Sequence, residues 1–93
     1  MTKLTSEQIS KSLGPLSGWQ QAGDEIVKTY QFKNYYETMA FVNAIAFLAH
    51  QSDHHPDLAV GYNQCKVTYS THSEGGVTQK DIDSAARVDG LLT

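Results

Sequence analysis

Three of the four histidines in this 93-residue chain fall in two short segments. His54 and His55 stand between Asp53 and Pro56, and His72 closes a later run with strand character. Imidazole gives and takes protons near neutral pH, because its ordinary pKa is about 6.5. The pattern therefore indicates acid–base chemistry on a small molecule, with Asp53 placed to orient one ring and select its tautomer.

Two other interpretations of the histidines stay open. In a structural one, a histidine of the adjacent pair hydrogen-bonds the loop and the other is exposed, because adjacent side chains in extended backbone point to opposite sides. In a metal-binding one, His50 and His54 have the i, i+4 spacing of many zinc sites, and His55 and His72 would complete four nitrogen ligands. Gln51 stands where a zinc-metalloprotease motif needs glutamate, and His50 suits the end of a helix dipole. We therefore expect no metal.

Other kinds of site have little support in the sequence. Cys65 is the only cysteine, so an internal disulfide is excluded, and its place in a strand-like run favours a small buried hydrophobe. Gly75 and Gly76 lack the lysine and the spacing of a phosphate-binding loop. The formal net charge is −3 and the basic residues are scattered, so we expect no nucleic-acid partner. With no signal peptide and no long apolar run, we expect a cytoplasmic protein without a membrane partner.

Hydrophobic periodicity, caps and turn residues predict the order helix, strand, strand, helix, strand, strand, helix. The helices are expected at about 5–13, at 34–51 and from 78 onward, and the strands at 18–22, 25–33, 59–62 and 64–72. Paired strands separated by helices predict one α+β domain over residues 1–93, a four-stranded antiparallel sheet with helices packed on one face. Alternation along the last strand would place His72 on the open face of the sheet, opposite Cys65.

The helix expected at 34–51 is apolar on more than one side. Met39 and Val42 lie on one side of it, whereas Phe41 and Ile45 lie on another. A helix that is apolar almost all round must be buried on more than one side, and a domain of this size offers too little mass for that. We therefore expect a homo-oligomer in which the same helix of a second copy supplies the cover.

A longer motif connects the histidines with the rest of the chain. It consists of His-His-Pro at 54–56, an aromatic residue six positions after the proline (Tyr62), a histidine ten further on (His72) and a downstream aspartate (Asp81). In this motif, and over nearly its whole length, the chain resembles the pterin-4a-carbinolamine dehydratase family. The resemblance implies a family fold with a four-stranded antiparallel sheet, helices on one side, and dimers or tetramers formed through strands and the long helix.

The resemblance also implies an activity. Such an enzyme removes water from 4a-hydroxytetrahydrobiopterin and gives quinonoid dihydrobiopterin. It needs no cofactor, because the pterin is the substrate, and it recycles the tetrahydrobiopterin spent by aromatic amino acid hydroxylases. The alternative is a non-catalytic module on the same fold, one that binds pterin or has a dimerisation or regulatory role.

By family analogy, His54 and His72 would share the acid and base work, and His55 would hold the substrate. The positions expected to line or support the pocket are Asp53, Pro56, Ser70, Thr71, Trp19 and Asp81. The chain departs from the family at His50, where many members carry an acid. This departure removes His50 from the expected catalytic set.

Overall fold

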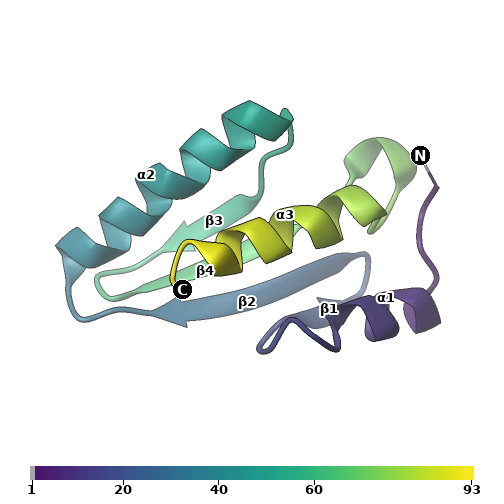
Figure 1. The fold of residues 1–93 in the computed structure, drawn as a ribbon, viewed down its shortest axis with the longest axis horizontal. Coiled ribbons are helices and arrows are strands. Elements are labelled where there is room, and N and C mark those ends of the chain that lie inside the picture. Colours follow the sequence, from purple (N-terminus) through teal and green to yellow (C-terminus); the bar gives the residue numbers. More distant parts are fainter. Residues whose placement is uncertain (1) are drawn as a thin grey trace.

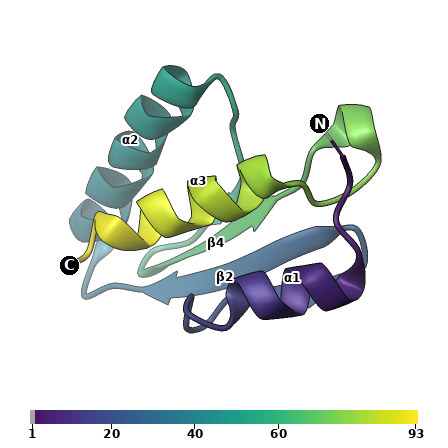
Figure 2. The ribbon, with the colours of Figure 1, turned by 45° about the vertical axis from the view of Figure 1, so that its right-hand side comes forward.

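The computed structural model describes residues 2–93 and has two layers, with three α-helices against one face of a four-stranded antiparallel sheet (Figure 1 and Figure 2). The elements in chain order are α1 (Ser6–Leu13), β1 (Gln20–Ala22), β2 (Glu25–Gln31), α2 (Tyr35–Ser52), β3 (Asp57–Val60), β4 (Gln64–Tyr69), the short 3₁₀ helix η1 (His72–Glu74) and α3 (Gln79–Gly90). The strands lie in the order β1-β2-β4-β3. The predicted α+β class and the predicted order of helices and strands are confirmed. Within the described residues, no helix combines the length and the apolar character needed to cross a membrane.

The core lies between the sheet and the helices. In the central strand pair, Ile26 stands opposite Tyr69 and Tyr30 opposite Cys65, and all four side chains are buried. Because strand side chains alternate between faces, this register points one apolar face of β2 and β4 at the helices. The prediction that Cys65 is a small buried hydrophobe is confirmed, and burial raises the pKa of its thiol.

The helix starts follow the predicted capping signals. At α1, the Thr5 hydroxyl accepts a hydrogen bond from the backbone of Gln8, whose side chain accepts one from the backbone of Thr5. At α2, Asn34 accepts from the backbone of Glu37 as expected. The carboxylate of Glu37 bonds the backbone N–H of Lys33.

The first three strands differ from the prediction in their boundaries. The third strand is Asp57–Val60, two residues earlier than expected, because the Gly61 N–H donates to the Gln64 carbonyl and closes the turn there. The first two strands are shorter than expected, at Gln20–Ala22 and Glu25–Gln31. These shifts leave Tyr62 in the exposed β3–β4 turn.

The fourth strand ends at Tyr69, three residues before its predicted end. Thr71 pairs with Gly76 in an isolated bridge, and Gly75 between them adopts a left-handed conformation with φ of 71°. His72 therefore begins the turn of η1, and the prediction that it lies on the open face of the sheet is wrong. The turn carries His72 beyond the end of the strand.

Candidate functional site

A cavity of about 260 Å³ lies where the α2–β3 loop meets the end of β4 and the start of α3. Three histidines line it, although they come from two separate segments. The residues that line the cavity are Asp53, His54, His55, Ser70, Thr71, His72, Ser73 and Lys80. The structure thus brings together six of the nine residues expected to form the site.

Asp53 ends α2 and directs the chain into the cavity. Its φ of 53° is left-handed, a conformation that aspartate tolerates better than most residues. The backbone N–H of His54 then bonds the Ala49 carbonyl and closes the end of the helix. The carbonyl oxygen of Asp53 lies 3.5 Å from the Lys80 amine. Asp53 therefore contributes to the site mainly through its backbone, which turns the chain into the cavity and places a carbonyl oxygen near Lys80.

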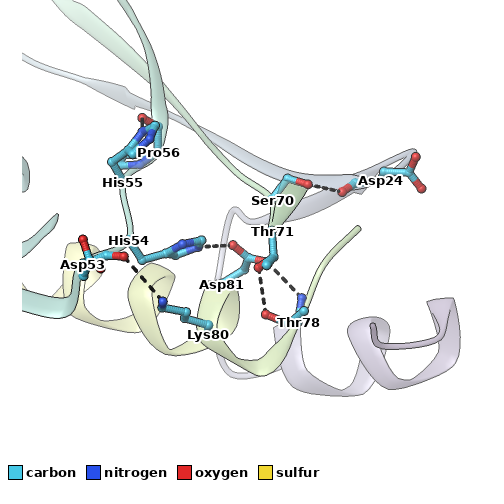
Figure 3. A network of polar contacts seen from close by, with 10 residues as sticks. All are labelled: Asp24, Asp53, His54, His55, Pro56, Ser70, Thr71, Thr78, Lys80 and Asp81. Carbon is cyan, nitrogen blue, oxygen red and sulfur yellow. Dashed lines mark hydrogen bonds and ion pairs between the residues drawn. The ribbon is translucent and has the colours of Figure 1, made fainter. Parts of the chain in front are cut away.

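His54 is the most firmly held of the three histidines. Only 10% of its side chain is exposed, and its ring stacks on Tyr69 with 5.6 Å between ring centroids. Its Nε2 lies 2.5 Å from Oδ1 of Asp81 (Figure 3). Burial raises the pKa of Tyr69 to about 12, so the ring beneath His54 is a neutral phenol.

Asp81 is fully buried behind His54 and connects three segments. Its Oδ2 accepts hydrogen bonds from the Thr71 hydroxyl at 2.8 Å and from the Thr78 backbone N–H at 2.9 Å, as Figure 3 shows. These bonds fix the carboxylate, and the carboxylate fixes the ring of His54. In the structure, the contact that orients an imidazole therefore comes from Asp81, whereas the sequence had suggested Asp53 for it.

The hydrogen-bond partners select a tautomer for each histidine of the pair. A carboxylate accepts hydrogen bonds, so the contact with Asp81 places a proton on Nε2 of His54 and leaves Nδ1 for proton exchange. Nδ1 of His55 lies 3.2 Å from the Pro56 carbonyl, which can only accept, so His55 is protonated at Nδ1 and has Nε2 left. The nitrogen left without a protein partner is therefore Nδ1 in His54 and Nε2 in His55.

Of the remaining expected residues, His72 and Ser70 line the cavity, whereas Pro56 and Trp19 do not. His72 is exposed at the start of η1. Pro56 is buried in the α2–β3 loop, directly after His55. The Ser70 hydroxyl donates to the Asp24 carbonyl at 2.9 Å. Trp19 does not line the cavity; it is buried in the core, 6.2 Å from the ring of Tyr69.

Sequence reasoning missed Lys80, Ser73 and Tyr69. Lys80 brings a cation to the cavity from the first turn of α3, and its position directly before Asp81 was the signal that could have found it. Tyr69 is buried on the same face of β4 as Cys65, but nothing in the pattern shows that His54 stacks on it. Among residues 2–93, no group of three or more His, Cys, Asp or Glu side chains is arranged to hold a metal ion.

Comparison with known proteins shows which family the chain resembles. Residues 2–91 match the family model described as pterin 4 alpha carbinolamine dehydratase. The chain belongs to this family. A relative from Nitrosomonas eutropha that carries the family name is 53% identical over 92 residues, covering 99% of this chain and 80% of that protein. A relative from Sulfolobus acidocaldarius with the same name is 45% identical over 89 residues, covering 96% of this chain and 98% of that one.

Solved structures show the same fold. One from Brucella melitensis, described as a transcriptional coactivator/pterin dehydratase, superposes with a TM-score of 0.94 at 33% identity, covering 99% of this chain and all of that one. A second, described as a pterin dehydratase-like protein that is a RuBisCO assembly factor in the alpha-carboxysome, has a TM-score of 0.66 at 27% identity over 78% of this chain and 84% of that one. The family fold therefore occurs in proteins described by more than one role.

Proposed function

We propose that this protein is a 4a-hydroxytetrahydrobiopterin dehydratase that works by histidine acid–base catalysis. The observation that carries the proposal is the single cavity lined by His54, His55 and His72, in a chain of the pterin carbinolamine dehydratase family. The substrate is a pterin with a hydroxyl group on C4a. No further cofactor takes part, because the pterin itself undergoes the reaction.

The reaction needs two proton transfers on neighbouring atoms. The C4a–O bond breaks and the oxygen leaves as water after receiving a proton, while N5 loses its proton and a C4a=N5 double bond forms. No electrons are exchanged with another molecule. An acid near the 4a-oxygen and a base near N5 therefore suffice, and positioned proton transfer of this kind contributes about 10²–10⁴-fold in rate.

The histidines have suitable geometry for these roles. His54 is held by Asp81 and Tyr69, so its free nitrogen keeps one direction, whereas His72 is exposed on the opposite segment of the cavity. We assign the acid and base work to His54 and His72 and substrate holding to His55. Ser70 and Thr71 line the cavity in the segment that carries His72, and Asp81 acts by positioning His54.

The chemistry of the substrate and of the product indicates which reactions must precede and follow the dehydration. The 4a-hydroxypterin arises when a tetrahydropterin is spent in an oxygen-dependent hydroxylation, so we propose that an aromatic amino acid hydroxylase supplies the substrate. The quinonoid product must then be reduced to complete the recycling of tetrahydrobiopterin. We place this activity in the cytoplasm.

The test is to generate 4a-hydroxytetrahydrobiopterin in solution and to follow its loss by absorbance with the purified protein. We expect the wild type to accelerate the decay, and the His54→Ala and His72→Ala variants to lose about 10²–10⁴-fold of that acceleration. His50→Ala is the matched control, because His50 is exposed on α2 and does not line the cavity. A wild-type rate equal to that of buffer would refute the proposal.

A second candidate function is a non-catalytic pterin-binding or regulatory module. It is favoured by the solved relatives, one of which is described as a coactivator and another as an assembly factor. The same experiment separates the two functions. A module of this kind would bind 7,8-dihydrobiopterin in a titration, and its presence would leave the decay of the 4a-hydroxypterin unchanged.

A further inference from the structure

A second hollow of about 390 Å³ adjoins the histidine cavity. The residues that line it are Ala22, Asp24, Glu25, Ser70, His72 and Gly75. Ser70 and His72 also line the histidine cavity, so the two spaces share a wall. The proposed mechanism assigns a role to the first space and none to the second.

The chemistry of a pterin indicates which part of it would enter the second hollow. This step rests on the proposed function. The substituent of a pterin is carried on C6, which is bonded directly to N5, the atom that loses a proton in the dehydration. The substituent therefore begins beside the group that handles N5. Of the two histidines assigned the acid and base work, His72 lies in the shared wall. With His72 as the base that receives the N5 proton, a ring bound against the histidines has its C6 position next to the second hollow.

The shared wall is held firmly in place. The Ser70 hydroxyl donates to the carbonyl of Asp24 and joins the end of β4 to the β1–β2 turn, as Figure 3 shows. The pairing of Ala22 with Glu25 closes that turn in the sheet. Asp24 and Glu25 therefore belong to a fixed rim and not to a free loop.

The charge of this rim would discriminate between substituents. Asp24 and Glu25 bring two carboxylates, and the described residues that line the hollow include no lysine or arginine. Lys3 lines a different hollow together with Asp24, and Lys80 lies in the histidine cavity. Hydroxyl groups can donate hydrogen bonds to carboxylates, whereas a phosphate or a carboxylate brought beside them is repelled.

We infer that Asp24 and Glu25 form the subsite for the C6 substituent, and that they make this protein select pterins with a neutral, hydroxylated substituent over pterins with an anionic one. Biopterin, which carries a dihydroxypropyl group, belongs to the favoured class. A pterin whose substituent ends in a phosphate belongs to the excluded class. The two residues are thus specificity determinants outside the expected catalytic set.

The test compares two ligands that differ in charge. The affinities of 7,8-dihydrobiopterin and of 7,8-dihydroneopterin monophosphate are measured by calorimetry at pH 8 and low salt. This pH lies above the ordinary imidazole range, so histidine charge contributes little. We expect the wild type to bind the neutral ligand at least about tenfold more tightly, the effect of about 1.4 kcal/mol of repulsion. Salt should reduce that preference.

The variants decide whether the rim causes the preference. Asp24→Asn combined with Glu25→Gln removes both charges and keeps hydrogen-bonding oxygens. The phosphate-bearing ligand should therefore bind this variant more tightly than it binds the wild type, and the preference should fall to about threefold or less. Glu7→Gln is the matched control, since Glu7 is an exposed acid on α1 that does not line the hollow. This control should keep the wild-type preference.

The outcomes distinguish the subsite from the proposed function. Equal affinities in the wild type, or an unchanged preference in the double variant, overturn the subsite even when 4a-hydroxytetrahydrobiopterin is dehydrated normally. A protein that binds neither ligand and leaves the decay of the 4a-hydroxypterin unchanged refutes the proposed function, and the subsite with it.

Discussion

Asp81 accepts hydrogen bonds from three segments that are separate in the sequence. Its oxygens bond His54 in the α2–β3 loop, Thr71 after β4 and the backbone of Thr78 at the start of α3. The carboxylate is fully buried, so none of these bonds is exchanged easily for water. One residue therefore joins the orientation of an imidazole to the start of a helix.

Replacing Asp81 with asparagine should reverse the tautomer of His54. An amide nitrogen in place of one carboxylate oxygen can donate to Nε2 of His54, which would move the ring proton to Nδ1. We expect the Nε2–H form in the wild type and the Nδ1–H form in Asp81→Asn, measured by long-range nitrogen–proton NMR of the ring. The variant should also lose most of the proposed dehydratase activity.

The cost in stability provides a second measurement on the same variant. Leaving buried donors poorly paired should cost about 1–3 kcal/mol in the free energy of unfolding. Asp83→Asn is a suitable control, because Asp83 is an exposed acid on the same helix. If the tautomer of His54 were the same in Asp81→Asn as in the wild type, Asp81 would not be the residue that positions the ring.

At the scale of elements, Asp89 joins the end of α3 to the sheet. Its Oδ1 accepts hydrogen bonds from Trp19 Nε1 at 3.1 Å and Lys28 Nζ at 2.9 Å, and also from the Tyr30 hydroxyl. An acid in the last turn of a helix is disfavoured by the helix dipole, so these bonds must offset that cost. Burial alone would raise the pKa of Asp89, but the bonds from Tyr30, Lys28 and Trp19 outweigh burial and lower it.

This network predicts a particular pH dependence of stability. A carboxyl group whose pKa is lower in the folded state stabilises the fold above the unfolded-state pKa of about 3.9, and the contribution is lost as the pH falls through the folded-state pKa. We expect Asp89→Asn to lower the free energy of unfolding by about 1–3 kcal/mol at pH 7. The difference from the wild type should shrink below pH 4, as measured by urea unfolding across a pH series.

Asp83→Asn again provides the comparison, because the exposed Asp83 should give little difference at any pH. A difference between wild type and Asp89→Asn that stayed constant from pH 7 to pH 3 would show that the charge of Asp89 does not contribute through this network.

Most of the elements could be predicted from local signals. The capping residues Thr5 and Asn34 and the alternation through Ile26 and Tyr30 act over a few positions, and the structure follows them. The end of β4 was missed because it depends on a bridge from Thr71 to Gly76 and on a bond from Thr71 to a helix further along the chain. Such contacts between distant parts of the chain cannot be predicted from local hydrophobic periodicity.

The sequence predicted most of the residues that line the cavity, but not which side chains bond one another there. The spacing of the histidines and of Asp81 pointed to the cavity that the structure contains. Sequence proximity favoured Asp53 as the partner of an imidazole, but the structure joins His54 to Asp81, 27 positions away. A pairing over that distance depends on how α3 packs, which no nearby residue reveals.

At the scale of the whole molecule, one side of α2 lacks cover. The helix packs against the core through Thr38, Phe41 and Ile45, whereas Tyr36 is 79% exposed and Phe47 63% exposed on its outer side. The helix stands at the outside of the helical layer in both ribbon views (Figure 1 and Figure 2). Exposed aromatic side chains on one helix are the kind of surface that an oligomer buries.

We predict that the protein forms a homodimer or homotetramer through this surface of α2. Phe47→Glu should raise the dissociation constant at least about tenfold, because it places a charge in an apolar contact. Sedimentation velocity over a range of concentrations measures this change. Ser10→Glu, on the exposed side of α1, should leave association unaltered. A wild type that stayed monomeric at every concentration would contradict the prediction.

The backbone N–H of Thr78 is bonded to the same carboxylate that holds the ring of His54. Deuterium from solvent can replace that amide proton only when its hydrogen bond to Asp81 breaks. The hydrogen-exchange rate at Thr78 therefore measures how often this bond opens. A ligand bound in contact with His54 should stabilise the closed hydrogen-bond network and slow this exchange. The single backbone N–H of Thr78, directly before α3, would thus report occupancy of the cavity without any label on the ligand.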